Sequence, residues 1–173
     1  MAATDPAAPV VVSDAGPLIH LDELGCLDLL ADFASVLVPE AVWGEVHIHR
    51  PSALTHPGVD LVCVTPSSNP EAAALEALAQ VLVLHTGELE ALRVALEHRR
   101  SLLLTDDTAA RLAAGNLGIT VHGTIGVVVR SIRRQRRTAQ QVLDVLHSLP
   151  QKSTLHLKRS LLDAVIKEVE NSI

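Results

Sequence analysis

Apolar positions along the chain alternate between short continuous runs and longer helical patterns. Continuous runs rich in Val and Leu predict buried strands, and apolar residues spaced three or four apart predict amphipathic helices. Five strands are predicted, at 10–12, 35–38, 61–64, 102–105 and 119–122. Because helical segments separate these strands, we expect a three-layer α/β fold. Its sheet would be mainly parallel, with about five strands and helices on both faces.

Residues typical of helix boundaries mark the segments between the strands. Pro17 begins a helix over 17–21, and Asn69-Pro70-Glu71 supplies a cap, a proline and an acid for a helix reaching 83. Further helices are predicted at 24–30, 40–47, 86–99, 108–114, 124–134, 138–149 and 155–169, with a loop over 49–60. No repeat or low-complexity segment interrupts this pattern. We therefore expect one domain over 1–173, ending in C-terminal helices at about 138–171.

The composition argues against several classes of protein. Hydrophobic residues make up 48% of the chain, which disfavours disorder, and Phe33 and Trp43 are the only aromatics, which disfavours base stacking on aromatic platforms. Cys26 and Cys63 show no zinc-ligand spacing and fit a reducing compartment. No apolar run approaches the ~20 residues that cross a bilayer, and 1–9 lacks the features of a signal peptide. We expect a cytoplasmic protein that does not enter a membrane.

The charge is negative overall but unevenly distributed. A net charge of −6 argues against binding nucleic acid through bulk attraction. Arginines nevertheless gather in one short segment, at Arg130, Arg133, Arg134, Arg136 and Arg137. This cluster is either a solvated helix face or an RNA contact, with Arg130, Arg133, Arg134 and Arg137 as the candidate contacts.

Acidic residues follow two of the predicted strands directly. Asp14 follows the first strand, and Asp106 and Asp107 follow the fourth. The carboxyl ends of parallel strands meet at one edge of a sheet, where sites form. Each of these acids could also cap the next helix. Clustered carboxylates repel one another unless a cation neutralises them, and Mg²⁺ or Mn²⁺ prefers oxygen ligands. We therefore expect Asp14, Asp106 and Asp107 to bind such a metal.

Two glutamates could reach the same edge from neighbouring helices. Glu45 lies on the helix after the second strand, and Glu88 lies in the first turn of its helix. Each has an ordinary alternative, since Glu45 could be solvated surface and Glu88 could simply favour the helix dipole. The histidines show no metal-binding spacing, and we expect them to be surface or core residues.

Five segments together resemble the PIN-domain superfamily, in particular PIN-like proteins related to VapC toxins. They are VVSDAGPLI at 11–19, VPEAVWGEV at 38–46, GELEAL at 87–92, LLLTDDTAAR at 102–111 and GTIGV at 123–127. The resemblance covers roughly residues 10–135 in family order.

The resemblance implies a parallel sheet and cleavage of RNA that depends on Mg²⁺ or Mn²⁺, with water attacking a phosphodiester. The implied catalytic residues are Asp14, Glu45, Glu88, Asp106 and Asp107, supported by Ser13 and Thr105. It further implies an endoribonuclease that is the toxin of a toxin–antitoxin pair, with a small antitoxin protein as partner. A homodimer is also expected, as in relatives.

The sequence departs from these relatives at two places. Ala15-Gly16 stands where relatives usually carry Thr-Ser, and His85 stands where many carry Asp. The alternative is therefore a non-catalytic PIN-like module that binds RNA or a protein. A phosphotransfer domain fits less well, because Gly16 breaks the Asp-x-Asp pattern of haloacid-dehalogenase-type phosphatases. A response-regulator receiver would need the acidic pair early in the chain.

Overall fold

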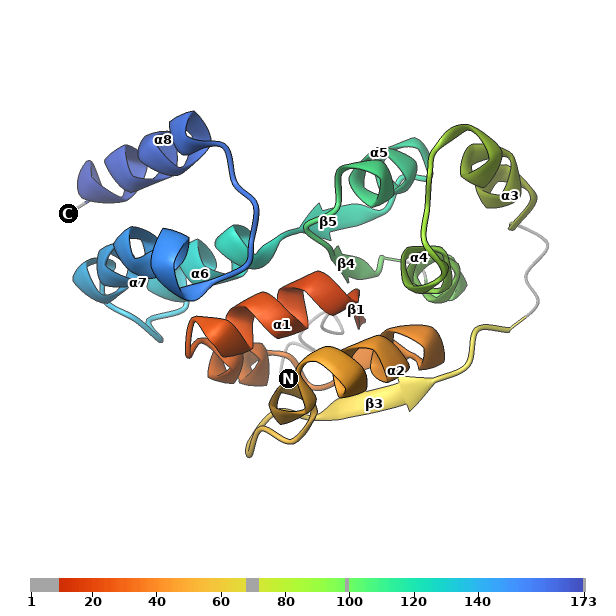
Figure 1. Ribbon diagram of the computed structural model, residues 1–173, viewed down its shortest axis with the longest axis horizontal. Helices are drawn as coiled ribbons and strands as arrows, with labels where there is room; N and C mark the ends of the chain where they lie inside the picture. Colours follow the sequence, from red (N-terminus) through yellow and green to blue (C-terminus); the bar gives the residue numbers. More distant parts are fainter. Residues whose placement is uncertain (1–9, 68–71, 99, 173) are drawn as a thin grey trace, which may run out of the picture.

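Short strands alternate with helices up to residue 122, and only helices and their connections follow in the described chain (Figure 1). The protein is represented by a computed structural model that describes residues 10–67, 72–98 and 100–172. The strands are β1 (Val11–Ser13), β2 (Val36–Pro39), β3 (Leu61–Val64), β4 (Leu102–Leu104) and β5 (Thr120–His122). The α-helices are α1 (Ala15–Glu23), α2 (Glu40–His49), α3 (Ala72–Val81), α4 (Thr86–Glu97), α5 (Thr108–Asn116), α6 (Thr124–Arg133), α7 (Ala139–Lys152) and α8 (Arg159–Glu170).

The strands form one parallel sheet with β1 at its centre. The order is β3-β2-β1-β4-β5, and Val11 pairs with Val36 on one side and with Leu102 on the other. The two strands that precede the acidic residues of interest, β1 and β4, are therefore neighbours. Their carboxyl ends meet at one edge of the sheet, as the sequence predicts.

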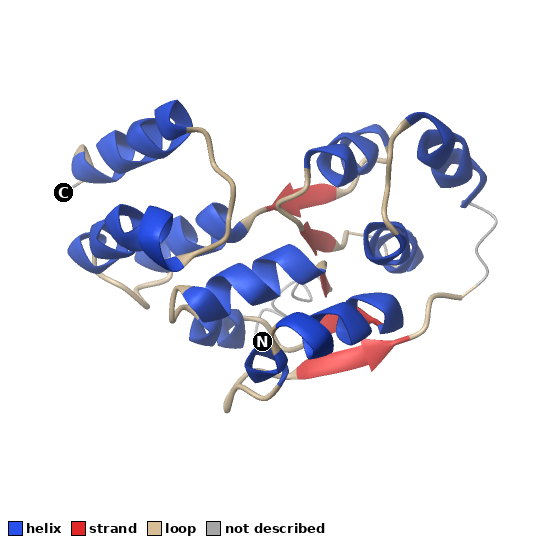
Figure 2. Cartoon of the chain, in the orientation of Figure 1, coloured by secondary structure: helices blue, strands red, loops and turns tan. Residues whose placement is uncertain are grey.

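Successive residues of the central strands face opposite sides and build two separate cores. Val11 and Leu104 pack with residues of α1, α2, α6 and α7, whereas Val12 and Leu103 pack with residues of α3, α4 and α5. Figure 2 shows helices on both sides of the strands. The expected three-layer α/β fold is confirmed, and the aliphatic strands are buried on both faces as a parallel sheet requires.

Two local predictions differ in detail from the structure. The helix expected at 24–30 is instead a 3₁₀ helix, η1 (Leu27–Asp32), and the expected loop at 49–60 contains a second one, η2 (Pro51–Leu54). The predicted helix start at Asn69-Pro70-Glu71 lies outside the described residues. None of the helices in 10–67, 72–98 and 100–172 is long and apolar enough to cross a bilayer.

The largest error concerns the last helix, which was predicted over 155–169. α8 begins only at Arg159, and residues 153–158 form an extended connection from α7, here called the strap. In the strap Ser153, Leu155 and Leu157 are half-buried, whereas Thr154, His156 and Lys158 are exposed. The segment therefore follows a period of two.

The carboxylate of Glu23, at the end of α1, holds the start of the strap. It accepts hydrogen bonds from Ser153 Oγ at 2.8 Å, from the Thr154 amide at 2.7 Å and from Thr154 Oγ1 at 3.0 Å. These long-range bonds compete with a helical path for the strap. They also hold the pKa of Glu23 below its usual value, although burial alone would raise it.

Replacing Glu23 should loosen the strap without unfolding the domain. We expect Glu23→Ala to lower amide-exchange protection of Thr154 by about tenfold, because the variant loses hydrogen bonds to a charged acceptor. Hydrogen exchange followed by mass spectrometry of the strap would measure this. Glu168→Ala on α8 is the matched control, since Glu168 is exposed and makes no side-chain hydrogen bond within the described residues. Equal protection in both variants would contradict the role of Glu23.

Candidate acidic site

Asp14 lies at the centre of the sheet edge, immediately after β1. Its side chain caps α1 by accepting a hydrogen bond from the Ala15 amide at 2.7 Å. The second carboxylate oxygen accepts from Thr105 Oγ1 at 3.0 Å, across the β1–β4 pair. The residue is only 7% exposed. Asp14 is therefore a helix cap and also the most buried acid of the edge.

The surroundings of Asp14 favour its protonated form. Burial raises its pKa from 3.8 to about 6, and the negative charges of Glu88 and Glu45 add to that shift. The hydrogen bonds from Ala15 and Thr105 act in the opposite direction but do not cancel it. A carboxylate at this position needs more positive charge than the protein supplies.

Three acids, Asp14, Glu45 and Glu88, lie close together around Gly87. A Cβ on Gly87 would lie 3.4 Å from Oε2 of Glu45 and 3.8 Å from Oδ1 of Asp14. Glu45 is largely exposed on α2, while Glu88 follows Gly87 in the first turn of α4. The Glu88 side chain accepts from the His85 amide at 2.8 Å and so completes the capping of α4. Glu88 therefore lies in the first turn of α4, where it favours the helix dipole, and its charge also acts on Asp14.

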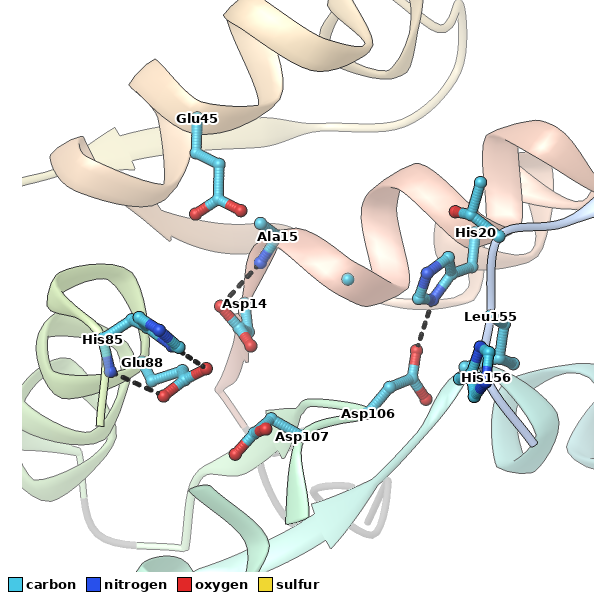
Figure 3. Close-up of a pocket in the computed structure, with 12 residues that line it drawn as sticks. Asp14, Ala15, His20, Glu45, His85, Glu88, Asp106, Asp107, Leu155 and His156 are labelled. Atoms are coloured by element: carbon cyan, nitrogen blue, oxygen red, sulfur yellow. Dashed lines mark hydrogen bonds and ion pairs between the residues drawn. The ribbon is translucent and has the colours of Figure 1, made fainter. Parts of the chain in front are cut away.

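The adjacent acids Asp106 and Asp107 point to opposite sides, as Figure 3 shows. Asp107 caps α5 by accepting from the Ala110 amide at 2.8 Å, and its own amide bonds to Thr105 Oγ1 at 3.2 Å. Thr105 therefore links the Asp107 turn to Asp14.

Asp106 is held by a different set of partners. Its oxygens lie 2.8 Å from His20 Nδ1, 2.8 Å from the Thr124 amide and 2.6 Å from Thr124 Oγ1. Burial would raise the pKa of Asp106, but these hydrogen bonds outweigh it and hold the pKa below its usual value. Sequence reasoning missed His20, because its partner lies 86 positions away and no local spacing marks the pair.

All five expected acids line one cavity of about 610 Å³ at the sheet edge. His20 and His85 line it from α1 and from the start of α4, and Thr154, Leu155 and His156 line it from the strap. The strap is a part of the site that sequence reasoning missed. Its alternation of apolar and polar residues was the available signal. Ser13 is buried beneath the cavity, where its hydroxyl bonds to the Asp14 carbonyl at 2.9 Å.

The donor set fits a hard divalent cation in its chemistry. Asp14, Glu45 and Glu88 offer carboxylate oxygens, and their mutual repulsion at Asp14 is the kind that a cation relieves. Within the described residues, no group of three His, Cys, Asp or Glu side chains is already arranged to hold one ion. Mg²⁺ commonly uses only one or two carboxylates and several waters, so this arrangement still suits it.

The two departures from relatives lie in this cavity. A Cβ on Gly16 would make ordinary contacts, 3.5 Å from His20 Cε1 and 3.7 Å from Oδ2 of Asp106, so a serine would fit there. His85 is exposed, and its hydrogen bond with Glu88 raises its pKa. Gly16 therefore lies beside His20 and Asp106, and His85 is bonded to Glu88.

The arginine cluster lies at the far end of α6, about 15 Å along the helix from Thr124. Arg130 and Arg134 pair with Asp32, and Arg137 pairs with Asp28. Arg136 also approaches Asp32, at 3.7 Å, and Arg133 is exposed. Most of these arginines therefore form ion pairs with the aspartates of η1. An RNA contact at this cluster stays a prediction.

The fold and the site together define an α/β protein with an acidic cavity at the carboxyl edge of a parallel sheet. A family model described as a PIN domain matches residues 10–171, so the chain belongs to the PIN-domain family. PIN domains are in general metal-dependent nucleases, which relates this cavity to a nucleic-acid substrate. The comparison with curated proteins found no match. The expected family and fold are confirmed.

The charge of Asp14 should make the metal-free protein less stable as the pH rises. Its pKa is higher in the folded protein than in the unfolded chain, so the folded state binds the proton more tightly. The free energy of unfolding should therefore fall between about pH 4 and pH 6. Asp14→Asn cannot ionise, and we expect it to be up to about 3 kcal/mol more stable than the wild type at pH 7.

Urea unfolding in EDTA at a series of pH values would measure this difference, which should vanish near pH 4. Asp60→Asn is the control, because Asp60 is exposed and its side chain makes no hydrogen bond among the described residues. A variant less stable than the wild type at pH 7 would contradict the account of Asp14.

Proposed function

We propose that this PIN-domain protein is a Mg²⁺- or Mn²⁺-dependent endoribonuclease and the toxin component of a toxin–antitoxin pair. The observation that carries the proposal is the burial of Asp14 beside Glu45 and Glu88 at the carboxyl edge of the sheet. Because burial and the charges of Glu45 and Glu88 oppose ionisation of Asp14, this carboxylate lowers the stability of the folded protein when no cation is bound. That cost fits a site that binds a cation, because perturbed groups gather at functional sites.

Asp14 and Asp107 are the residues best placed to hold the metal, with Glu45 and Glu88 contributing directly or through water. A bound divalent cation supplies positive charge that activates water and stabilises the phosphoryl oxygens. Thr105 keeps the two aspartates in register by bonding to Asp14 and to the Asp107 amide.

Asp106, the third expected metal ligand, has a second role available. Its hydrogen bond to His20 fixes the imidazole at the wall of the cavity. Because three hydrogen-bond contacts already engage its oxygens, metal binding by Asp106 stays a prediction. His20 would then present its other ring nitrogen toward the substrate.

The partners that go with this proposal are an RNA substrate, a small antitoxin protein and a second copy of the chain. The exposed apolar residues Ile48, Val81, Val83 and Leu112 offer surface for protein contacts. A cytoplasmic location fits the same proposal, since toxin and substrate would meet there.

Removing the Asp14 carboxylate should abolish cleavage. We expect Asp14→Asn to lower Mn²⁺-dependent cleavage of single-stranded RNA by at least about 100-fold, because the central acid of the proposed metal site is lost. Gel analysis of labelled RNA would measure the rate, and circular dichroism would verify the fold.

Asp60→Asn, purified in parallel, should cleave as the wild type does and so show that loss of an exposed carboxylate leaves the activity intact. Equal cleavage by Asp14→Asn and Asp60→Asn would count decisively against the proposed active site.

A non-catalytic module that binds RNA or a protein is the second candidate. The observation that favours it is the lack, among the described residues, of any group of three donors already placed to hold a metal. Ala15 and Gly16 also replace two hydroxyls that relatives usually carry. Such a module would keep the fold and the cavity but would not need a cation.

Calorimetric titration with Mn²⁺ would separate the two candidates. For a nuclease we expect saturable binding that Asp14→Asn weakens by at least about tenfold and that Asp60→Asn leaves unchanged. For a non-catalytic module, the wild type, Asp14→Asn and Asp60→Asn would all give the same weak heat of Mn²⁺ binding. The second result would favour the module over the enzyme.

A further inference from the structure

A second cavity of about 810 Å³ adjoins the acidic one on the other side of the strap. Asp106, Leu155 and His156 line both cavities, so the two share a wall. Figure 3 shows Leu155 and His156 beside Asp106, on the side away from Glu88. We call this second cavity the strap groove. Its volume is within the range of small-molecule sites.

Two cations line the strap groove and differ from the arginines of α6. Arg111 comes from α5 and Lys158 from the end of the strap, and both are exposed. Neither forms an ion pair within the described part of the chain, whereas Arg130 and Arg137 are paired with η1. In a chain with a net charge of −6, these two charges are available to an anion.

Glycine at position 123 sets the position of one of these cations. A Cβ on Gly123 would overlap the Arg111 guanidinium and come 2.6 Å from Oδ1 of Asp106. The absence of a side chain therefore lets the guanidinium lie close to the border between the two cavities. A planar guanidinium binds phosphate through two hydrogen bonds and can also lie flat on a base.

Apolar side chains also line the groove. Ile125, Leu157 and Val165 are half-buried there, and Leu161 is 52% exposed at the rim. The groove therefore combines two cations with apolar side chains. It matches a ligand with a charged part and a flat, weakly polar part.

We infer that the strap groove binds a nucleotide of single-stranded RNA that flanks the cleaved phosphodiester. Arg111 and Lys158 would contact its phosphate, and the apolar wall would take its base. The base must be unpaired to reach such a wall, which selects single strands. This inference rests on the proposed function for its substrate, and charge complementarity favours RNA over a peptide.

The inference can be tested without cleavage or metal. Binding of a fluorescent single-stranded RNA would be followed by anisotropy in EDTA at several salt concentrations. We expect Arg111→Gln and Lys158→Gln each to lower affinity by about fivefold. Each should also reduce the slope of log affinity against log salt by about 0.7, the value for one lost phosphate contact on a single strand.

Two further variants make the test specific. Lys167→Gln removes the same charge from α8, where Lys167 is exposed and lines a different cavity, and should change neither affinity nor slope. Leu161→Ser should lower affinity and leave the slope unchanged, because it removes an apolar contact and no charge. In cleavage assays, Arg111→Gln should raise KM more than it lowers kcat.

Unchanged affinity and slope in both charge variants would overturn the inference, and so would the absence of RNA binding by the wild type. A groove that serves a peptide partner would give the first of these results. Changed slopes together with full cleavage by Asp14→Asn would overturn the proposed active site and leave the strap groove standing.

Discussion

The burial of the Asp14 carboxylate beside other acids, at the carboxyl edge of the sheet, is the constraint on which this site depends. Parallel pairing of β1 with β4 brings Asp14 against Thr105, and the charges of Glu45 and Glu88 lie near the same carboxylate. Two hydrogen bonds stabilise the Asp14 carboxylate, yet its pKa is still raised to about 6. The fold thus holds an unfavourable charge that a divalent cation would make favourable.

Neighbouring residues at this edge have separate tasks. Asp107 caps α5 and faces the acidic cluster, while Asp106 turns to His20 and Thr124. The peptide bond between Asp106 and Asp107 therefore connects the proposed metal site to the imidazole of His20, which Asp106 holds in place. This division explains why two adjacent acids are needed where one cap would be enough for α5.

The C-terminal segment contributes to the site as well as to the core. Glu23 holds the start of the strap, and the strap in turn separates the acidic cavity from the groove beside it. One cavity is rich in carboxylates, whereas the other carries unpaired cations and an apolar wall. That asymmetry fits a polymer whose cleaved phosphate is bound through a cation and whose next phosphate is bound by the protein directly.

The sequence by itself determined the order of strands and helices, the parallel three-layer fold and the acids at the strand ends, because these follow from local periodicity and from the geometry of parallel sheets. It also predicted that Asp14 and the Asp106-Asp107 pair would meet if their strands were neighbours, and the structure showed that β1 and β4 are paired. Only the tertiary structure decided that Asp106 bonds to His20, that Glu23 keeps 153–158 extended, and that Arg111 lies against Gly123. Each of these depends on contacts between residues far apart in the chain, which no local pattern encodes.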